Sequence, residues 1–210
     1  MKNLGRRDLL KTAVAGMALA YTPARARDVV FVPGTGTPPP SGLSPLLLSR
    51  AKAALESHQS RVRNRDILAI ADFSQASRDP RFHIVDLRSG QSTALLVAHG
   101  KGSDPSHSGW VQHFSNQHGS EATSAGSYLV GDTYFGQYGE SRRLIGLDPE
   151  NDQAENRAIV IHPAWYVNES LIAEQGKIGR SQGCFAFAQG DIRQVLERVA
   201  PGSLLYAGKA

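Results

Sequence analysis

Residue types suited to covalent chemistry are concentrated in one short segment, Ser181-Gln182-Gly183-Cys184. Cys184 is the single cysteine of the 210-residue chain, so it cannot form an internal disulfide. A free thiol with a pKa of about 8.5 is mostly protonated near neutrality, and it becomes a nucleophile when a nearby base removes its proton. Gly183 lets the backbone come close to a substrate carbonyl. The segment predicts acyl transfer through Cys184, and the alternative is a small, buried, inert side chain.

A base for this thiol is present upstream, because His162 follows the apolar run Ala158–Ile161. Histidine is the usual base for a cysteine nucleophile. Since the run does not alternate between polar and apolar residues, we expect a strand that is buried on both faces. The end of a rigid strand is a suitable place to hold a base. The alternative is a histidine that only completes a strand end.

Three further polar residues are assigned to substrate binding. Arg180 adds a positive charge near the thiolate or a substrate carboxylate, and Gln182 can donate a hydrogen bond but cannot titrate. His99 ends another expected strand before a glycine and is expected to line the cleft, with a turn residue as the alternative. Four histidines could form a metal cluster, but their spacing is irregular and no Cys or Glu completes a ligand pattern. We therefore assign no metal and no cofactor; the four are His99, His107, His113 and His118.

The positive charge of the chain is confined to its N-terminus. Residues 1–26 contain five basic residues and one acidic residue, which accounts for the whole formal charge of +4. The remaining residues, 27–210, contain 18 basic and 18 acidic residues and are neutral. A neutral body has little general attraction for phosphate backbones, so nucleic acid is excluded as a partner.

The same 26 residues have the order of features found in an export signal. Paired arginines, Arg6-Arg7, precede a weakly apolar stretch from Thr12 to Tyr21, and Ala24-Arg25-Ala26 resembles a cleavage site. The apolar stretch is too short to cross a bilayer core of about 30 Å. We therefore expect an export signal of the twin-arginine type over 1–26, a Pro/Gly-rich tether over 27–44, and a catalytic domain over 45–210. The expected location is the periplasm, without a transmembrane anchor.

The catalytic domain is expected to be mostly β with flanking helices. One helix is predicted from Pro45 to Gln59 behind Ser44 as N-cap, and another from Asp191 to Val199. A Gly/Ser/His-rich stretch between Gly100 and Gly126 lacks a clear period, and a loop of that length is usually functional. Strands are predicted over Ile67–Phe73, Phe82–Leu87, Thr93–His99, Ser127–Gly131, Arg143–Leu147, Arg157–His162 and Ser203–Ala207.

Together, the segments Arg157–His162 and Ser181–Cys184 resemble the active-site signature of the L,D-transpeptidase catalytic domain, the YkuD-type family. The resemblance extends over most of the body, through Ala98–Asp104, Phe114–Asn116 and Leu144–Leu147. It implies an L,D-transpeptidase-like β-sandwich of mixed sheets.

The resemblance also implies a reaction. A cysteine, here Cys184, attacks the carbonyl of the third residue of a peptidoglycan stem peptide, and D-alanine leaves. The resulting thioester is passed to an amine, and His162 acts as the base. Ser181 and Gly183 take the loop positions, and the N–H groups of Gly183 and Cys184 are expected in an oxyanion hole. Stem peptides are the expected partners, a carbapenem the expected inhibitor class, and the chain is treated as a monomer.

Three positions depart from the commoner pattern of the family. Gln182 stands where a histidine is usual, Pro163 stands where a glycine is usual, and Ala186 stands where Arg or Asn is frequent. Ala186 removes a substrate contact that Arg180 is expected to replace.

Two rival functions stay open. One is an L,D-carboxypeptidase or cross-link hydrolase that uses the same cysteine and histidine with water as acceptor. The other is a non-catalytic wall-binding protein.

Overall fold

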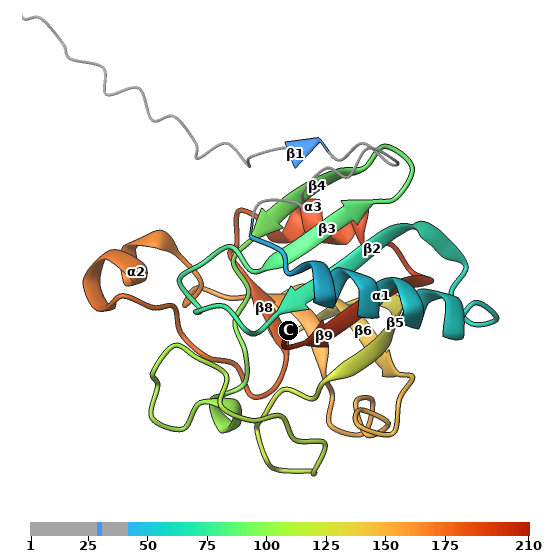
Figure 1. Cartoon of the computed structure of the whole chain (residues 1–210). Helices are drawn as coiled ribbons and strands as arrows, with labels where there is room; N and C mark the ends of the chain where they lie inside the picture. Colours follow the sequence, from blue (N-terminus) through green and yellow to red (C-terminus); the bar gives the residue numbers. More distant parts are fainter. Residues whose placement is uncertain (1–28, 31–41) are drawn as a thin grey trace, which may run out of the picture.

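The computed structural model describes residues 29–30 and 42–210, so the expected export signal and most of the expected tether lie outside the described residues. Within them the chain forms one curled, mixed sheet with three α-helices beside it (Figure 1). The helices are α1 (Pro45–Ser57), α2 (Glu169–Gln175) and α3 (Ile192–Arg198), and a short 3-10 turn covers Lys101–Ser103. The mostly β class with flanking helices is therefore confirmed.

The sheet has the strand order β1-β4-β3-β2-β9-β5-β6-β7-β8. Two neighbouring pairs, β2 with β9 and β7 with β8, are parallel, and the other pairs are antiparallel. The strand bounds are β1 Val29–Val30, β2 Asn64–Asp72, β3 Phe82–Asp86, β4 Gln91–Leu95, β5 Gly126–Gly136, β6 Gly139–Gly146, β7 Val160–Pro163, β8 Phe185–Phe187 and β9 Ser203–Gly208.

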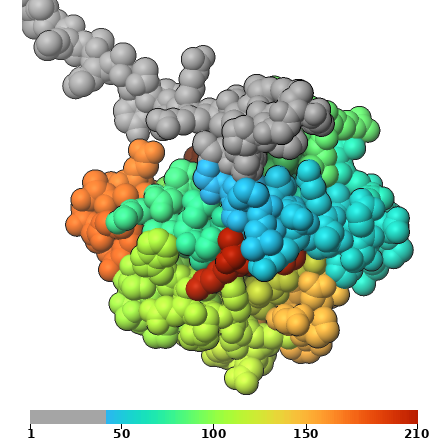
Figure 2. All heavy atoms as spheres, in the orientation of Figure 1, coloured from blue at the N-terminus to red at the C-terminus, as the bar shows by residue number. Residues whose placement is uncertain are grey.

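Helix α1 covers one face of the sheet, next to β2 and β9 (Figure 1). It begins as the sequence predicts, because the Ser44 side chain accepts a hydrogen bond from the Leu47 N–H and a proline occupies the first turn. Its buried side chains, spaced by three or four residues, face the sheet; they are Leu47, Leu48, Ala51 and Leu55. In the space-filling view, α1 and the loop region beyond residue 100 lie on the same face of the molecule (Figure 2).

The largest hydrophobic core lies on the other side of β2 and β9 and is rich in aromatic rings. Phe82 packs edge-on against Phe187 with ring centroids 4.7 Å apart, and Tyr128 packs in the same way against Phe185 at 5.4 Å. Such edge-to-face pairs add stabilisation beyond the area that they bury. Because Phe185 and Phe187 flank Ala186 in β8, the segment that follows Cys184 is fixed by the core.

Each expected strand has a counterpart, with two corrections: β4 ends at Leu95, so His99 does not end a strand, and β7 begins at Val160, because residues 151–158 form turns. Two elements next to the candidate site have no counterpart among the expected elements. Strand β8 has only three residues, and α2 has no buried residue, so neither gives a period that sequence analysis can detect. Helix α2 lies in the connection that carries the chain from β7 to β8. The stretch between Gly100 and Gly126 is irregular as expected, apart from the turn at Lys101–Ser103.

Two general searches cover only the residues that the structure describes. In that part of the chain, no helix combines the length and the apolar character that crossing a membrane requires. Over the same residues, no group of three or more His, Cys, Asp or Glu side chains is arranged to hold a metal ion.

Acid should destabilise this fold through two fully buried histidines, His83 and His99. Burial lowers the pKa of His83 to about 4, and burial with the nearby Arg81 charge lowers that of His99 to about 3. The unfolded chain, with histidine pKa values of about 6.5, takes up protons that the folded chain does not. Stability present at neutral pH is therefore lost as the pH falls from about 6.5 toward the folded pKa values.

We expect the free energy of unfolding to fall by up to ~1.4 kcal/mol per pH unit for each of these histidines between about pH 6 and pH 4.5. His83→Leu removes one proton-binding group, so its slope should be shallower. Urea unfolding at several pH values measures both slopes. An unchanged slope in the variant would show that His83 does not contribute.

Candidate active site

Cys184 lies immediately before β8 and is half-buried. Its Sγ lies 3.5 Å from the carbonyl oxygen of Ala158, and the Val160 N–H also faces the sulfur. Ala158 has a φ of 52°, a left-handed conformation that is uncommon for a residue with a side chain. Such strained backbone clusters at functional sites. Burial raises the pKa of the Cys184 thiol, while the Val160 N–H and the Arg157 charge lower it.

Ser181 braces the loop that carries Cys184. Its hydroxyl accepts a hydrogen bond from the Gly183 N–H at 3.1 Å and donates one to the Cys184 carbonyl at 2.7 Å. The Gly183 N–H is thus already used within the loop, which corrects its expected place in the oxyanion hole. Thr123 joins this loop to the long loop before β5, which is the stretch between Gly100 and Gly126. Its hydroxyl accepts a hydrogen bond from the Gly100 N–H and donates one to the Gly183 carbonyl.

Gly183 has a φ of 115°, and a Cβ there would lie 2.8 Å from both the Ala122 oxygen and the Ile159 Cδ1. Gly183→Ala should therefore lower the free energy of unfolding by about 2–4 kcal/mol and displace Cys184. Gly176→Ala is the matched control, since Gly176 also has a positive φ but nothing within 4 Å; it should cost about 1–2 kcal/mol. Urea unfolding and the rate of thiol modification measure both effects. Equal losses in the two variants would contradict the crowding at Gly183.

His162 lies in β7 and is buried, with the exposed Tyr138 ring stacked on it at 4.4 Å between centroids. Its Nδ1 lies 2.9 Å from the Pro163 carbonyl oxygen. A carbonyl only accepts, so Nδ1 carries the proton and Nε2 keeps its lone pair. Burial lowers the pKa of His162, partly offset by the Pro163 hydrogen bond, so the ring is held in the neutral form that a base requires.

The parallel pairing of β7 with β8 brings Cys184 and His162 to one face of the sheet. Ile161 is opposite Phe185 and His162 is opposite Ala186. Side chains alternate along a strand, so Cys184, one residue before Phe185, shares the face of His162, and Ile161 and Phe185 point into the core. Diagonal neighbours on adjacent strands lie roughly 7–8 Å apart, within reach of side-chain rotation. The register thus puts Cys184 and His162 on one face of adjacent strands, although 22 positions separate them in the sequence.

The loop Ser181–Cys184, called the cysteine loop below, contains Gln182 and follows Arg180. The side chains of these two residues have different surroundings. The Arg180 guanidinium donates to the carbonyl oxygens of Asp104 and Pro105, so it holds the neighbouring loop. Gln182 is exposed, which leaves its amide accessible to a ligand.

The expectation that His99 lines the cleft is wrong, because its side chain is fully buried. Arg81 donates to its Nδ1 at 2.7 Å, so the proton of the neutral ring is on Nε2. That Nε2 lies 3.4 Å from Asp104 Oδ2, without the geometry of a hydrogen bond. His99 contributes through its backbone instead: its carbonyl accepts from the Ser181 N–H and helps to hold the cysteine loop.

Two tyrosines and an arginine also lie beside the site. The sequence predicts no role for Tyr138, and it gives Arg157 none beyond opening the segment that resembles the family signature. Tyr138 is at the tip of the β5–β6 hairpin and contacts His162, and no local motif marks it. Tyr166 lies near both Cys184 and Tyr138; burial and those two groups raise the pKa of its phenol, so it stays neutral. Arg157 begins the segment that leads to β7, and its neighbourhood with Cys184 becomes visible only in the fold.

The sequence profile of the L,D-transpeptidase catalytic domain matches residues 41–207 of the chain. The chain belongs to this family. The match includes the cysteine loop, β7 with His162, and the long loop before β5, so the L,D-transpeptidase domain accounts for the described body from residue 42 to residue 207.

Several solved L,D-transpeptidase structures are similar at low sequence identity. LdtMt1 in complex with imipenem shares 13% identity over 68% of this chain and 59% of that one, with a TM-score of 0.42. L,D-transpeptidase 3 from Mycobacterium tuberculosis with a faropenem-derived adduct shares 12% over 69% and 60%, with a TM-score of 0.42. An L,D-transpeptidase from Mycobacterium tuberculosis H37Rv shares 16% over 69% and 58%, with a TM-score of 0.40. The matched part thus spans about three fifths of these structures. No curated protein matches the chain.

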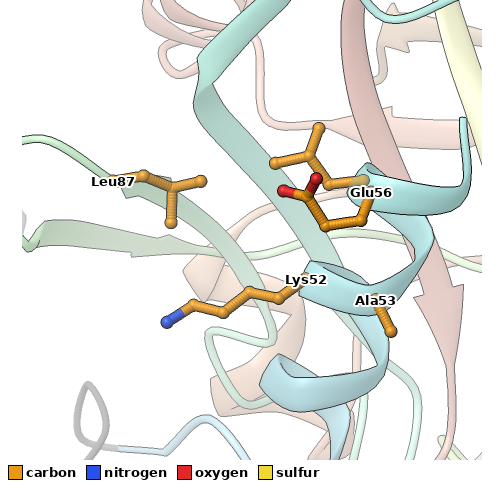
Figure 3. Close-up of a pocket in the computed structure, with 5 residues that line it drawn as sticks. Lys52, Ala53, Glu56 and Leu87 are labelled. Atoms are coloured by element: carbon orange, nitrogen blue, oxygen red, sulfur yellow. The ribbon is translucent and has the colours of Figure 1, made fainter. Parts of the chain in front are cut away.

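The surface also has a hollow that is separate from the cysteine loop. It is lined by residues of α1 and by Leu87, which follows β3 (Figure 3). Lys52 and Glu56 point along its rim, and Leu87 closes it from the opposite side. Its lining contains no cysteine and no histidine.

Proposed function

We propose that this L,D-transpeptidase domain acts on peptidoglycan stem peptides through a thioester on Cys184, with His162 as the base. The observation that carries the proposal is the β7–β8 register, which puts the thiol and a histidine with an unprotonated Nε2 on one face of the sheet. Acyl transfer through cysteine requires a base that can reach the thiol, and a histidine on the same face of an adjacent strand supports that role.

In the first half-reaction, Nε2 of His162 takes the thiol proton, and Sγ attacks a stem-peptide carbonyl at an L centre. The carbonyl carbon becomes tetrahedral, and its oxygen becomes an anion that the Cys184 N–H can stabilise by hydrogen bonding. The C–N bond then breaks, the proton on His162 passes to the departing amine, and the thioester remains.

In the second half-reaction, the neutral His162 takes a proton from an incoming amine, which attacks the thioester carbon. The C–S bond breaks, the sulfur recovers the proton from His162, and a new amide bond is formed. Both groups are uncharged in the resting site, because burial raises the pKa of Cys184 and lowers that of His162. The thiol must therefore lose its proton to His162 in the course of acylation.

The reaction products distinguish transfer to an amine from hydrolysis. Incubation with disaccharide-tetrapeptide and a free D-amino acid should give an exchanged muropeptide, detected by liquid chromatography with mass spectrometry. A tripeptide product as the sole product, unchanged by the added amino acid, would replace the transpeptidase proposal with an L,D-carboxypeptidase.

We also propose that the chain is exported to the periplasm by the twin-arginine route. Support comes from Arg6-Arg7, the weakly apolar stretch after them and Ala24-Arg25-Ala26. Replacing both arginines with lysine should block export and leave unprocessed chain inside the cell, while the native sequence should give a mature N-terminus at Arg27. Cell fractionation and N-terminal sequencing measure both. Normal export of the double-lysine variant would indicate the general secretory route.

A further inference from the structure

Arg157 lies directly behind the cysteine loop. Its Nη2 lies 3.3 Å from the position that a Cβ on Gly183 would take, and Gly183 immediately precedes Cys184. The side chain is half-buried, so this guanidinium is partly removed from water and its field is less screened than that of a surface arginine.

The guanidinium is held firmly by the long loop before β5. Its Nη1 donates to the Ser115 carbonyl at 2.8 Å, and its Nη2 donates to the Ser120 hydroxyl at 3.2 Å and to the Ala122 carbonyl. Ala122 is the residue whose carbonyl also lies against Gly183. Arg157 therefore fixes both the long loop and the segment that presents Cys184.

All of these acceptors are neutral, and among the ion pairs of the described residues none includes Arg157. Its positive charge is thus not cancelled by a carboxylate contact. The other titratable groups that face Cys184 are the phenols of Tyr128 and Tyr166 and the imidazole of His162. The phenols stay neutral because burial raises their pKa values, and the imidazole is neutral.

We propose that Arg157 is a positioning residue of the active site, which anchors the cysteine loop and places a fixed positive charge beside the nucleophile. It takes the part that sequence analysis gave to Arg180, whose guanidinium is turned to Asp104 and Pro105. The charge favours the thiolate and the anion that develops during attack, in a chain where Ala186 occupies the position often held by Arg or Asn.

The test is the pH dependence of Cys184 alkylation by iodoacetamide in the full folded domain, which needs no substrate. Arg157→Gln removes the charge and should raise the midpoint by about one pH unit, equivalent to roughly tenfold slower alkylation below the midpoint. Arg157→Lys keeps a positive charge, so its alkylation midpoint should lie close to that of the native protein. The matched control is Arg142→Gln, since Arg142 also donates to carbonyl oxygens but beside α3. An unchanged midpoint in Arg157→Gln, or an equal shift in the control, would overturn the proposal.

If Arg157→Gln does not fold, the wild-type protein supplies the test. A positive charge beside the sulfur should increase the ratio of the rates with anionic iodoacetate and neutral iodoacetamide above the ratio for N-acetylcysteine. A ratio equal to or below that reference would refute the role of Arg157. The inference rests on Cys184 as the reactive thiol of the proposed function. A shifted thiol midpoint without stem-peptide turnover would leave the role of Arg157 in place and remove only the transpeptidase proposal.

Discussion

Cys184→Ala should abolish all turnover of stem peptides, because no other thiol is present to form the thioester. A carbapenem, which presents a strained acyl group, should add covalently to the native protein and not to the variant. Muropeptide chromatography measures the first effect and intact-mass spectrometry the second. Since Cys184 is half-buried at the edge of the core, the variant should fold with an unchanged circular dichroism spectrum.

A carbapenem adduct on the alanine variant would show that another side chain is the nucleophile. The Ser181 hydroxyl is the nearest alternative in the loop, but it already accepts from the Gly183 N–H and donates to the Cys184 carbonyl. Its two roles in bracing the loop leave it poorly suited to attack.

His162→Ala should slow acylation by about 10²–10⁴-fold, the range expected for loss of a general base. Burial raises the pKa of Cys184, so without His162 the thiol remains protonated at neutral pH. The rate of the variant should recover partly as the pH rises, because the thiol then ionises without help. Single-turnover acylation across a pH series measures both effects.

His118→Ala is a suitable control for this variant, since His118 is exposed on the long loop and belongs to no part of the site. Its acylation rate should equal that of the native protein at every pH. A native rate in His162→Ala at neutral pH would remove His162 from the mechanism. His99 cannot replace it, because its ring is sealed between Arg81 and Asp104.

Much of the fold could be predicted from sequence where the side-chain pattern is strong. The α1 start is encoded by Ser44 and Pro45, and the double-sided burial of β7 is encoded by Ile159-Val160-Ile161. Strand β8 could not be found in this way, because three residues give no period. It forms because Phe185 and Phe187 enter the core from one face while Ala186 fits against Ala98 and Ala164 on the other.

That Cys184 and His162 share one face of the sheet could be anticipated from residue types and the family resemblance, but the contacts around them could not. Tyr138 reaches the site from a hairpin tip that no motif marks. Arg157 opens the segment that resembles the family signature, but only the fold shows its guanidinium against Gly183. For His99 the prediction was wrong. A histidine before a glycine suggested a cleft residue, whereas its ring is buried and accepts a hydrogen bond from the buried Arg81. Such errors arise because long-range packing decides which polar side chains reach solvent.

The most direct test of a thioester on Cys184 is the intact mass of the native protein rapidly quenched with acid during reaction with disaccharide-tetrapeptide. We predict a mass increase equal to that of the substrate minus the departing alanine, located by peptide mapping on the fragment that contains Cys184, and lost when an amine acceptor is added. Turnover with no such adduct, or an adduct mapped to any other residue, would contradict the account.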